Sequence, residues 1–382
     1  MLKKFYPLFF SFILIFLLFG IFLYWGFLFK EDVLKIGVMV PLSEKKISSG
    51  LTNLELIELG VKNINLDGGI NGYNVELVVR DSQCSSEGGL QAMEYFYSQK
   101  IKFVLGGICS DSVVGAKDFI NENKIILISS KAITLDLSDV DDFIYRNIPS
   151  VKNLANILSN EVYGDGVRKM GIINEQSNSM VSFKNEFIDD FTNLGGGIVF
   201  EHSFMSDLDL TEVSNSLKAF ETIDMDGFLV LVDSKISMKF LVSKLEKINF
   251  SGLFYFTDIV DDYDFIFFRE FLDKSKFVGY EIDINNNLSK SLIESYKIEY
   301  GREILRIQNF EYSAASFDLP FILKQGFSNC EFNNTVCVKS NLDNLGDFEG
   351  VLGVYSFNEF GDVELPVFKY VLDYGESLKL RD

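Results

Sequence analysis

The sequence predicts an α/β protein made of two Rossmann-like lobes, and three observations support this. Short, uncharged, β-rich segments recur along the chain, and most are separated by one amphipathic stretch of helical length. Such alternation with continuous apolar strands predicts parallel sheets covered by helices on both faces. The length of 382 residues favours two domains over one, and the number of expected strands fits two sheets.

The chain begins with a long apolar run. Lys3 and Lys4 precede residues 5–29, which carry no charge, and charged residues follow from Lys30. At about 1.5 Å per residue, a helix of this length can cross a bilayer. We therefore expect a single-pass cell-membrane anchor over residues 1–33, with the bulk of the chain extracytoplasmic because the lysines mark the inner side. A removed signal peptide is the alternative, although no A-x-A cleavage pattern is present.

The expected strands and helices follow this segment in order. Leu34–Val40 is a buried strand, and the helix after it carries apolar residues at helical spacing from Leu54 to Ile64 and ends at Gly68. Further short apolar runs are typical of buried strands: Val75–Val79, Phe103–Gly106, Ile125–Ser129, Met170–Asn174, Ile198–Glu201, Phe228–Val232 and Phe254–Phe256. A helix is expected over residues 111–121, after the strand Phe103–Gly106.

Charge and motifs exclude several classes of function. The net charge is −20 and no lysine- or arginine-rich run exists, so we expect no nucleic-acid partner, because phosphate binding needs a basic surface. The sequence contains no GxSxG, Walker-A, HExxH or CxxC motif, and its single histidine, His202, lies in an alternating stretch typical of a strand. We therefore expect a binding protein rather than an enzyme, with no cofactor and no metal.

The segment from Gly68 to Ser110 opens with GGINGYNVELVVRDSQC and closes with FVLGGICSDS. Together with YGREILRIQNFEYSAASFD at 300–318 and FEGVLGVYSFNEFGD at 348–362, it resembles the type I periplasmic binding protein family. The resemblance is to the branched-chain amino acid group of extracytoplasmic solute-binding proteins, and it covers almost everything after residue 34.

The resemblance implies that the chain crosses between its lobes three times through a three-segment hinge. Mapped on this sequence, the first lobe comprises 34–153 plus 284–346 and the second comprises 154–283 plus 347–382. The crossings are then expected near Pro149, Asn285 and Phe348.

Four cysteines in an exported chain suggest disulfides. The even count alone allows three pairings. The resemblance implies a bridge between Cys84 and Cys109, which leaves Cys330 to pair with Cys337 across a short loop.

Ser110 is the strongest candidate for a ligand contact in the first lobe. It stands where the expected helix begins, and serine is a good N-cap there. Amides at a helix N-terminus bind a carboxylate well, although a plain structural cap is the alternative. The resemblance implies that Ser110 contacts the α-carboxylate of a ligand. It also implies that the loop after Ile125–Ser129 contributes through Ala132, Ile133 and Thr134.

In the second lobe the resemblance implies site residues at Ser179, Asp233 and Asp258. The family is expected to carry aromatic residues at the first two positions, and this chain does not. Asp258 supplies an expected acid that would pair with a ligand ammonium group, a charge-assisted bond. Leucine, isoleucine or valine is therefore an unsafe assignment, and a small polar or cationic amino acid or an amide-like solute is the expectation.

These expectations combine into one function. We expect a membrane-tethered solute receptor that captures a small amino-acid-like ligand by hinge closure and delivers it to an ABC-type permease. The alternative is a sensor ectodomain that signals through a partner protein, because the same fold hosts both roles. The chain ends at Asp382 without a second span, which favours transport or a sensor that acts through a separate protein.

Overall fold

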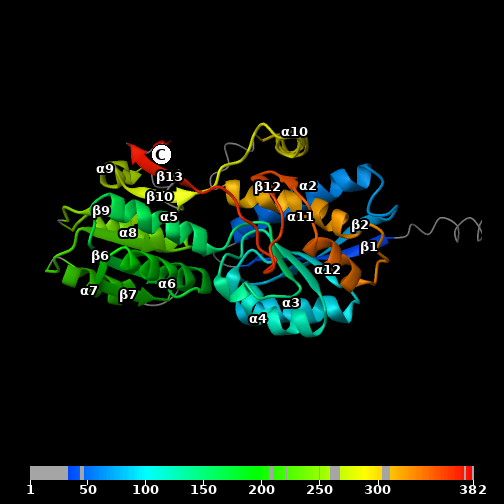
Figure 1. The fold of residues 1–382 in the computed structure, drawn as a ribbon, viewed down its shortest axis with the longest axis horizontal. Helices are drawn as coiled ribbons and strands as arrows, with labels where there is room; N and C mark the ends of the chain where they lie inside the picture. Colours follow the sequence, from blue (N-terminus) through cyan, green and yellow to red (C-terminus); the bar gives the residue numbers. More distant parts are fainter. Residues whose placement is uncertain are drawn as a thin grey trace, which may run out of the picture.

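The computed structural model describes residues 33–43, 47–205, 210–220, 222–248, 250–258, 267–302, 310–373 and 376–380. The predicted anchor run 5–29 therefore lies outside the described residues. Among the helices in these ranges, none combines the length and the apolar character that a membrane crossing requires. Figure 1 shows two lobes side by side, which confirms the predicted two-lobe α/β architecture.

The first lobe is built on a five-stranded parallel sheet in the order β2-β1-β3-β4-β5. Its strands are β1 (Val33–Val40), β2 (Asn74–Asp81), β3 (Phe103–Gly106), β4 (Ile126–Ser129) and β5 (Ile144–Arg146). The first four agree with the predicted strands. The fifth was not predicted, because it is three residues long and contains an arginine.

Helices cover both faces of this sheet (Figure 1). They are α2 (Ile47–Leu66), α3 (Ser86–Ser98), α4 (Ser110–Glu122), α10 (Asn287–Tyr300), α11 (Phe310–Gly326) and α12 (Thr335–Asp343). Helices α2 and α11 share one apolar core with β1, where Val38 and Val40 are fully buried. Helices α3 and α4 pack on the opposite face around Met39 and Val104. Both faces of the strands are thus buried, as their continuous apolar sequences predict.

The second lobe contains a seven-stranded sheet in the order β14-β13-β10-β9-β8-β6-β7. Its strands are β6 (Lys169–Glu175), β7 (Gly197–Phe204), β8 (Gly227–Leu231), β9 (Leu253–Phe256), β10 (Lys276–Gly279), β13 (Phe368–Asp373) and β14 (Glu376–Lys379). Strands β6 to β10 pair in parallel, whereas β13 and β14 join the edge in antiparallel pairing.

Alternate residues of the second sheet face two separate helical layers. Leu229 and Leu231 of β8 share a core with α5 (Val151–Gly164) and α6 (Asn178–Asn193). The remaining helices of this lobe are α7 (Leu210–Phe220), α8 (Lys235–Leu245) and α9 (Arg269–Leu272). Phe228 and Val230, which point the other way, share a core with residues of α7 and α8. The period of two along β8 thus places successive side chains in opposite layers.

Three connections join the lobes, and a short β-hairpin lies among them. The hairpin consists of β11 (Phe348–Gly350) and β12 (Gly353–Tyr355). Pro149 lies between β5 and α5, and Asn285 lies between β10 and α10. Phe348 begins β11, while the strand that enters the second sheet on the third connection starts at Phe368.

The hairpin is hydrogen-bonded to both of the other connections. The side-chain amide of Asn147, on the first connection, donates to the Tyr355 hydroxyl at 3.3 Å. On the second connection, the Asn286 side chain donates to the Gly350 carbonyl at 2.7 Å, and the Asp283 amide donates to the carbonyl of Val351 at 3.0 Å. All three connections are therefore fastened to one small element.

A buried carboxyl group of α11 is hydrogen-bonded to this hairpin. Asp318 is fully buried and accepts hydrogen bonds from the Val351 amide at 3.0 Å and from the Tyr355 hydroxyl at 3.1 Å. Burial raises the pKa of Asp318 to about 8. Burial thus favours the protonated form of this carboxyl group in the folded protein.

Both predicted disulfides are confirmed. Cys84 pairs with Cys109 at a Cα–Cα distance of 5.3 Å, and Cys330 pairs with Cys337 at 5.8 Å. The first bridge closes a sequence separation of 25 residues and the second closes 7. Because the entropy lost by the unfolded chain grows with loop length, the first bridge is expected to stabilise more.

We predict unequal losses of stability when the two bridges are removed. The double substitution Cys84→Ser with Cys109→Ser should lower the free energy of unfolding by about 3.5 kcal/mol, and Cys330→Ser with Cys337→Ser by about 2.4 kcal/mol. Urea unfolding of the oxidised protein and of both variants measures the difference. A larger loss from the second pair would contradict the loop-entropy account.

Candidate functional site

The two sheets share one strand order, and in each the order reverses at one point. The first runs β2-β1-β3-β4-β5, and the parallel part of the second runs β7-β6-β8-β9-β10, which is the same order in chain sequence. In open α/β sheets, ligands bind outside the carboxyl ends of strands where the strand order reverses. These points are β1 with β3 in the first lobe and β6 with β8 in the second.

A glycine turn follows β3 at the first of these points. Gly106 has φ +106°, and a Cβ there would lie 2.5 Å from the Met39 carbonyl oxygen. The next amide, of Gly107, donates to the same Met39 oxygen at 2.7 Å. The chain thus leaves β3 in close contact with β1, a path that a residue with a side chain would not fit. It then reaches Cys109 and the start of α4.

Ser110 is placed differently from the predicted N-cap. The N-cap of α4 is Cys109, which makes no side-chain capping bond, and Ser110 is the first helical residue. The Ser110 side chain is buried, and its Oγ accepts a hydrogen bond from the Ile133 amide at 3.2 Å. The prediction of a serine cap was therefore wrong, because the disulfide cysteine occupies that position. The serine instead joins the helix start to the loop after β4.

The loop after β4 contains the other first-lobe candidates. Ala132 and Thr134 are fully buried, and Ile133 is half-buried. The Ala132 amide donates to Ser129 Oγ at 3.1 Å. The Thr134 hydroxyl bonds Asp136 at the start of the short 3-10 helix Leu135–Leu137, so its side chain serves the loop itself. The backbone of the loop, rather than this hydroxyl, lies beside Ser110.

The structure brings Ser179 and Asp233 together at the second reversal point. Ser177 is the N-cap of α6, directly after β6, and Asp233 follows β8. The Ser177 and Ser179 hydroxyls donate to Asp233 Oδ2 at 3.0 and 3.1 Å. Hydroxyl and carboxylate groups therefore line the position where the resemblance implies aromatic side chains.

Sequence reasoning missed Glu175, the last residue of β6. It is buried, and its Oε2 accepts a hydrogen bond from the Asp233 amide at 2.8 Å while its Oε1 accepts one from the Ser237 hydroxyl. Burial, followed by the negative charge of Asp233, raises the pKa of Glu175 to about 8. An acid directly after a buried strand, MGIIN-E, was the signal that could have identified it.

Asp258 lies one strand away from this pair. It follows β9, the neighbour of β8, and the two strand ends are tied by a 2.8 Å bond from the Thr257 hydroxyl to the Val232 carbonyl. Asp258 is half-buried, and its negative charge, after burial, raises the pKa of Tyr280. It therefore shares the carboxyl edge of the sheet with Asp233.

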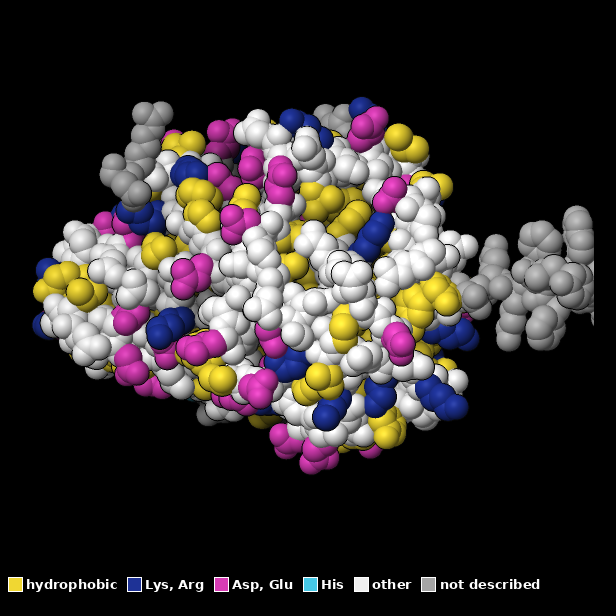
Figure 2. Space-filling model, turned by 45° about the vertical axis from the view of Figure 1, so that its right-hand side comes forward, with side chains coloured by type: hydrophobic (Ala, Val, Ile, Leu, Met, Phe, Trp, Pro, Cys, Tyr) yellow, Lys and Arg dark blue, Asp and Glu magenta, His cyan; other side chains and the backbone are white. Residues whose placement is uncertain are grey.

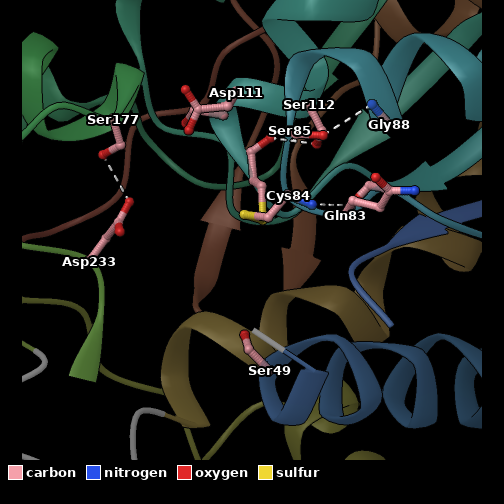
Figure 3. The surroundings of a disulfide bond; sticks show 12 residues. Ser49, Gln83, Cys84, Ser85, Gly88, Asp111, Ser112, Ser177 and Asp233 are labelled. Carbon is pink, nitrogen blue, oxygen red and sulfur yellow. Dashed lines mark hydrogen bonds between the residues drawn. A yellow bond between two sulfur atoms is a disulfide. The ribbon is translucent and has the colours of Figure 1, made fainter. Parts of the chain in front are cut away.

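The two reversal points meet at the junction of the lobes. The Asn178 amide at the start of α6 donates to Asp111 Oδ1 of α4 at 3.2 Å. The Leu135 amide donates to Ser182 Oγ of α6 at 3.1 Å. Figure 3 shows Ser177 and Asp233 on one side of this junction, with Asp111 and the Cys84 disulfide on the other. Side chains from both lobes thus lie around the junction.

The outer surface is mixed in charge. On the face shown in Figure 2, acidic and basic side chains are interspersed rather than gathered into one basic field.

His202 lies in β7, as predicted, where its ring is within hydrogen-bond distance of Ser216 Oγ at 3.1 Å.

Comparison with known proteins identifies related sequences. A family model described as periplasmic binding protein matches residues 33–361. An uncharacterised protein of Methanocaldococcus jannaschii is 26% identical over 175 residues, which is 40% of this chain and 42% of that protein. The Leu/Ile/Val-binding protein of Escherichia coli K12 is 28% identical over 108 residues, which is 28% of this chain and 29% of that protein. The chain thus matches less than half the length of these relatives.

Solved structures share the fold over most of the chain. The leucine-binding protein LivK of Thermotoga maritima has a TM-score of 0.78 at 18% identity, covering 91% of this chain and 98% of its own. A solute-binding protein of R. palustris in complex with benzoate also has a TM-score of 0.78, at 14% identity, covering 91% and 96%. The Escherichia coli, Thermotoga maritima and R. palustris proteins are named as binding proteins and not as enzymes, in agreement with the expectation from the sequence motifs.

We predict that Glu175 makes stability fall as pH rises. In the unfolded chain a glutamate ionises near pH 4.3, whereas folded Glu175 holds its proton to about pH 8. Between these values the folded state binds one proton more, so the free energy of unfolding falls by about 1.4 kcal/mol per pH unit from this group. Glu175→Gln should remove that slope in urea unfolding between pH 5 and about 8.

A matched control is Glu122→Gln, at an exposed position of α4. It should retain the pH dependence of the original protein. An unchanged slope in Glu175→Gln would show that the glutamate is ionised in the folded state.

Proposed function

This chain belongs to the type I periplasmic binding protein family, in its branched-chain amino acid group, and from that membership we propose that it is an extracytoplasmic solute-binding protein that closes around a small amino-acid-like ligand. The observation that carries the proposal is the meeting of two strand-order reversal points across the lobe junction. Ligands in open α/β sheets bind outside the carboxyl ends of strands at such points. Rotation of the lobes about their three connections would open and close the junction.

The first lobe would hold the acid end of the ligand. The first amides of α4 face out of its N-terminus, where a carboxylate is favoured. Ser110 lies in this turn, and its bond from the Ile133 amide joins the helix start to the loop of Ala132, Ile133 and Thr134. The helix terminus and the loop backbone thus form one continuous surface for a carboxylate.

The second lobe would contact the amine and the side chain of the ligand. Asp258 is the proposed partner of the ammonium group, through a charge-assisted bond. Ser179 and Asp233 present hydroxyl and carboxylate oxygens, which need hydrogen-bond donors and do not favour a hydrocarbon side chain. We therefore favour a small polar or cationic amino acid, or an amide-like solute, over leucine, isoleucine or valine.

The membrane and a permease are the proposed partners. The uncharged run 5–29 is long enough to anchor the chain as a single-pass protein with the lobes outside the cytoplasm. A closed receptor differs in shape from an open one, so a permease of the ATP-binding-cassette class can distinguish the loaded form. Delivery to such a permease is the transport role that we propose.

We predict a selective thermal response to amino acids. A ligand at about a hundred times its Kd stabilises the folded protein by about 2.7 kcal/mol, which raises the melting temperature. Serine, asparagine or lysine should raise it more than leucine does, and the combined variant Ser110→Ala with Asp258→Ala should abolish the rise. Differential scanning fluorimetry over the twenty amino acids and their amides measures this.

The role of the Asp233 carboxylate is tested by the same substitution at two positions. Asp233→Asn should weaken the response to lysine, whereas Asp189→Asn, on the exposed face of α6, should leave it intact. A response led by leucine and unchanged in the combined variant would place the ligand elsewhere and overturn the proposal.

We predict that the full chain is recovered from membranes with its N-terminal segment intact. A chain that starts at residue 34 should be recovered in the soluble fraction instead, because it lacks the apolar run. Fractionation followed by intact mass measurement distinguishes an anchor from a removed signal peptide. A mature mass without residues 1–33 would contradict the anchor.

A further inference from the structure

Arg146, at the end of β5, is fully buried and is bonded to the proposed ligand loop. Its Nη1 donates to the Thr134 carbonyl at 2.6 Å and to the Ala132 carbonyl at 3.2 Å. Nη2 donates to the Ser138 hydroxyl at 2.5 Å. One guanidinium group thus holds both ends of the segment that contains Ile133.

The counter-charge comes from a distant part of the chain. Asp362 lies on the third connection between the lobes, and its Oδ1 accepts from Arg146 Nε at 2.7 Å and from Nη2 at 2.6 Å. The Ser138 hydroxyl donates to the other oxygen of Asp362 at 2.8 Å. Because the pair is buried, its charges are stable only together and with these hydrogen bonds satisfied.

The backbone around Asp362 is docked on β5 as well. The Arg146 amide donates to the Gly361 carbonyl at 2.8 Å. Gly361 has φ +67°, and a Cβ there would lie 2.4 Å from the Ile144 carbonyl oxygen. Only a glycine therefore fits this close approach, which sets the position of the neighbouring Asp362.

The loop after β4, which Arg146 holds, contacts the second lobe at two points. The Leu135 amide donates to Ser182 Oγ of α6 at 3.1 Å. The Ile133 carbonyl accepts from the Val151 amide at the start of α5 at 2.9 Å. Arg146 is thus bonded to the third connection through Asp362. It is also bonded to the loop after β4, which contacts α5 and α6 on one face of the second sheet.

We propose that Arg146 is a positioning residue that fixes the backbone of residues 132–135 and couples it, through Asp362, to the third connection between the lobes. The part that concerns ligand binding rests on the proposed function. The planar guanidinium can donate to two carbonyls, one hydroxyl and one carboxylate at once, whereas a lysine ammonium cannot match this fork. Movement of the third connection on closure would therefore shift the loop.

Hydrogen exchange in the absence of any ligand tests the proposal. Arg146→Lys keeps a positive charge beside Asp362 but loses the fork, so exchange of the Ile133 and Leu135 amides should accelerate by about tenfold or more, since bonds from a charged donor stabilise by this order. Amides of β3 and β4 should keep their protection. Mass spectrometry of peptides covering 130–138 measures the ratio at a temperature where circular dichroism shows a folded protein.

A second ion-pair variant separates positioning from general destabilisation. Lys276 of β10 pairs with Glu161 and Asp165 at 2.6 Å in the second lobe. Lys276→Gln should lower the melting temperature without faster exchange in the 130–138 peptides. Equal acceleration of these peptides in both variants would reduce Arg146 to a structural residue.

Gly361→Ala keeps the test decisive if Arg146→Lys does not fold. The added methyl group displaces the turn from the Ile144 carbonyl and moves Asp362 while leaving Arg146 and the loop sequence intact. The 130–138 peptides should again exchange faster than those of β3 and β4. Unchanged loop exchange in Gly361→Ala or in folded Arg146→Lys would overturn the proposal, and this result is independent of whether any amino acid binds.

Discussion

Parallel pairing forces the carboxyl ends of neighbouring strands to one edge of a sheet, and the location of the proposed site depends on this constraint. In each lobe the strand order reverses beside the first strand, between β1 and β3 or between β6 and β8. The lobes face each other with these edges, as the bond between Asn178 and Asp111 shows. Residues as far apart in the sequence as Ser110 and Asp233 thereby lie at the carboxyl edges that face this junction.

Much of this architecture is readable from the sequence because the central strands are continuous apolar runs. Phe103–Gly106, for example, is fully buried over its whole length, which is the condition that produces such a run. The elements that were missed carry charges or are short. Ile144–Arg146 includes an arginine, and Lys276–Gly279 begins with a lysine. A short strand that begins or ends with a charged residue lacks the continuous apolar run on which the prediction depends.

The site could be predicted in position but not in its polar details. Ser110 and Asp233 lie at strand ends that the sequence marks clearly, whereas the helix cap belongs to Cys109 because the disulfide fixes that residue. Arg146 could not be recognised, because its partner Asp362 is 216 positions away and local pattern cannot bring the two together. The position of Glu175 directly after a buried strand was visible in the sequence, but its protonation was not, because that depends on burial and on the nearby charge of Asp233.

The hairpin of β11 and β12 has a mechanical consequence. The first connection is hydrogen-bonded to the hairpin at Tyr355, and the second connection is hydrogen-bonded to it at Gly350. The hairpin lies at the start of the third connection. If the lobes rotate as proposed, these bonds couple the three connections, so that one cannot twist without straining its bonds to the hairpin.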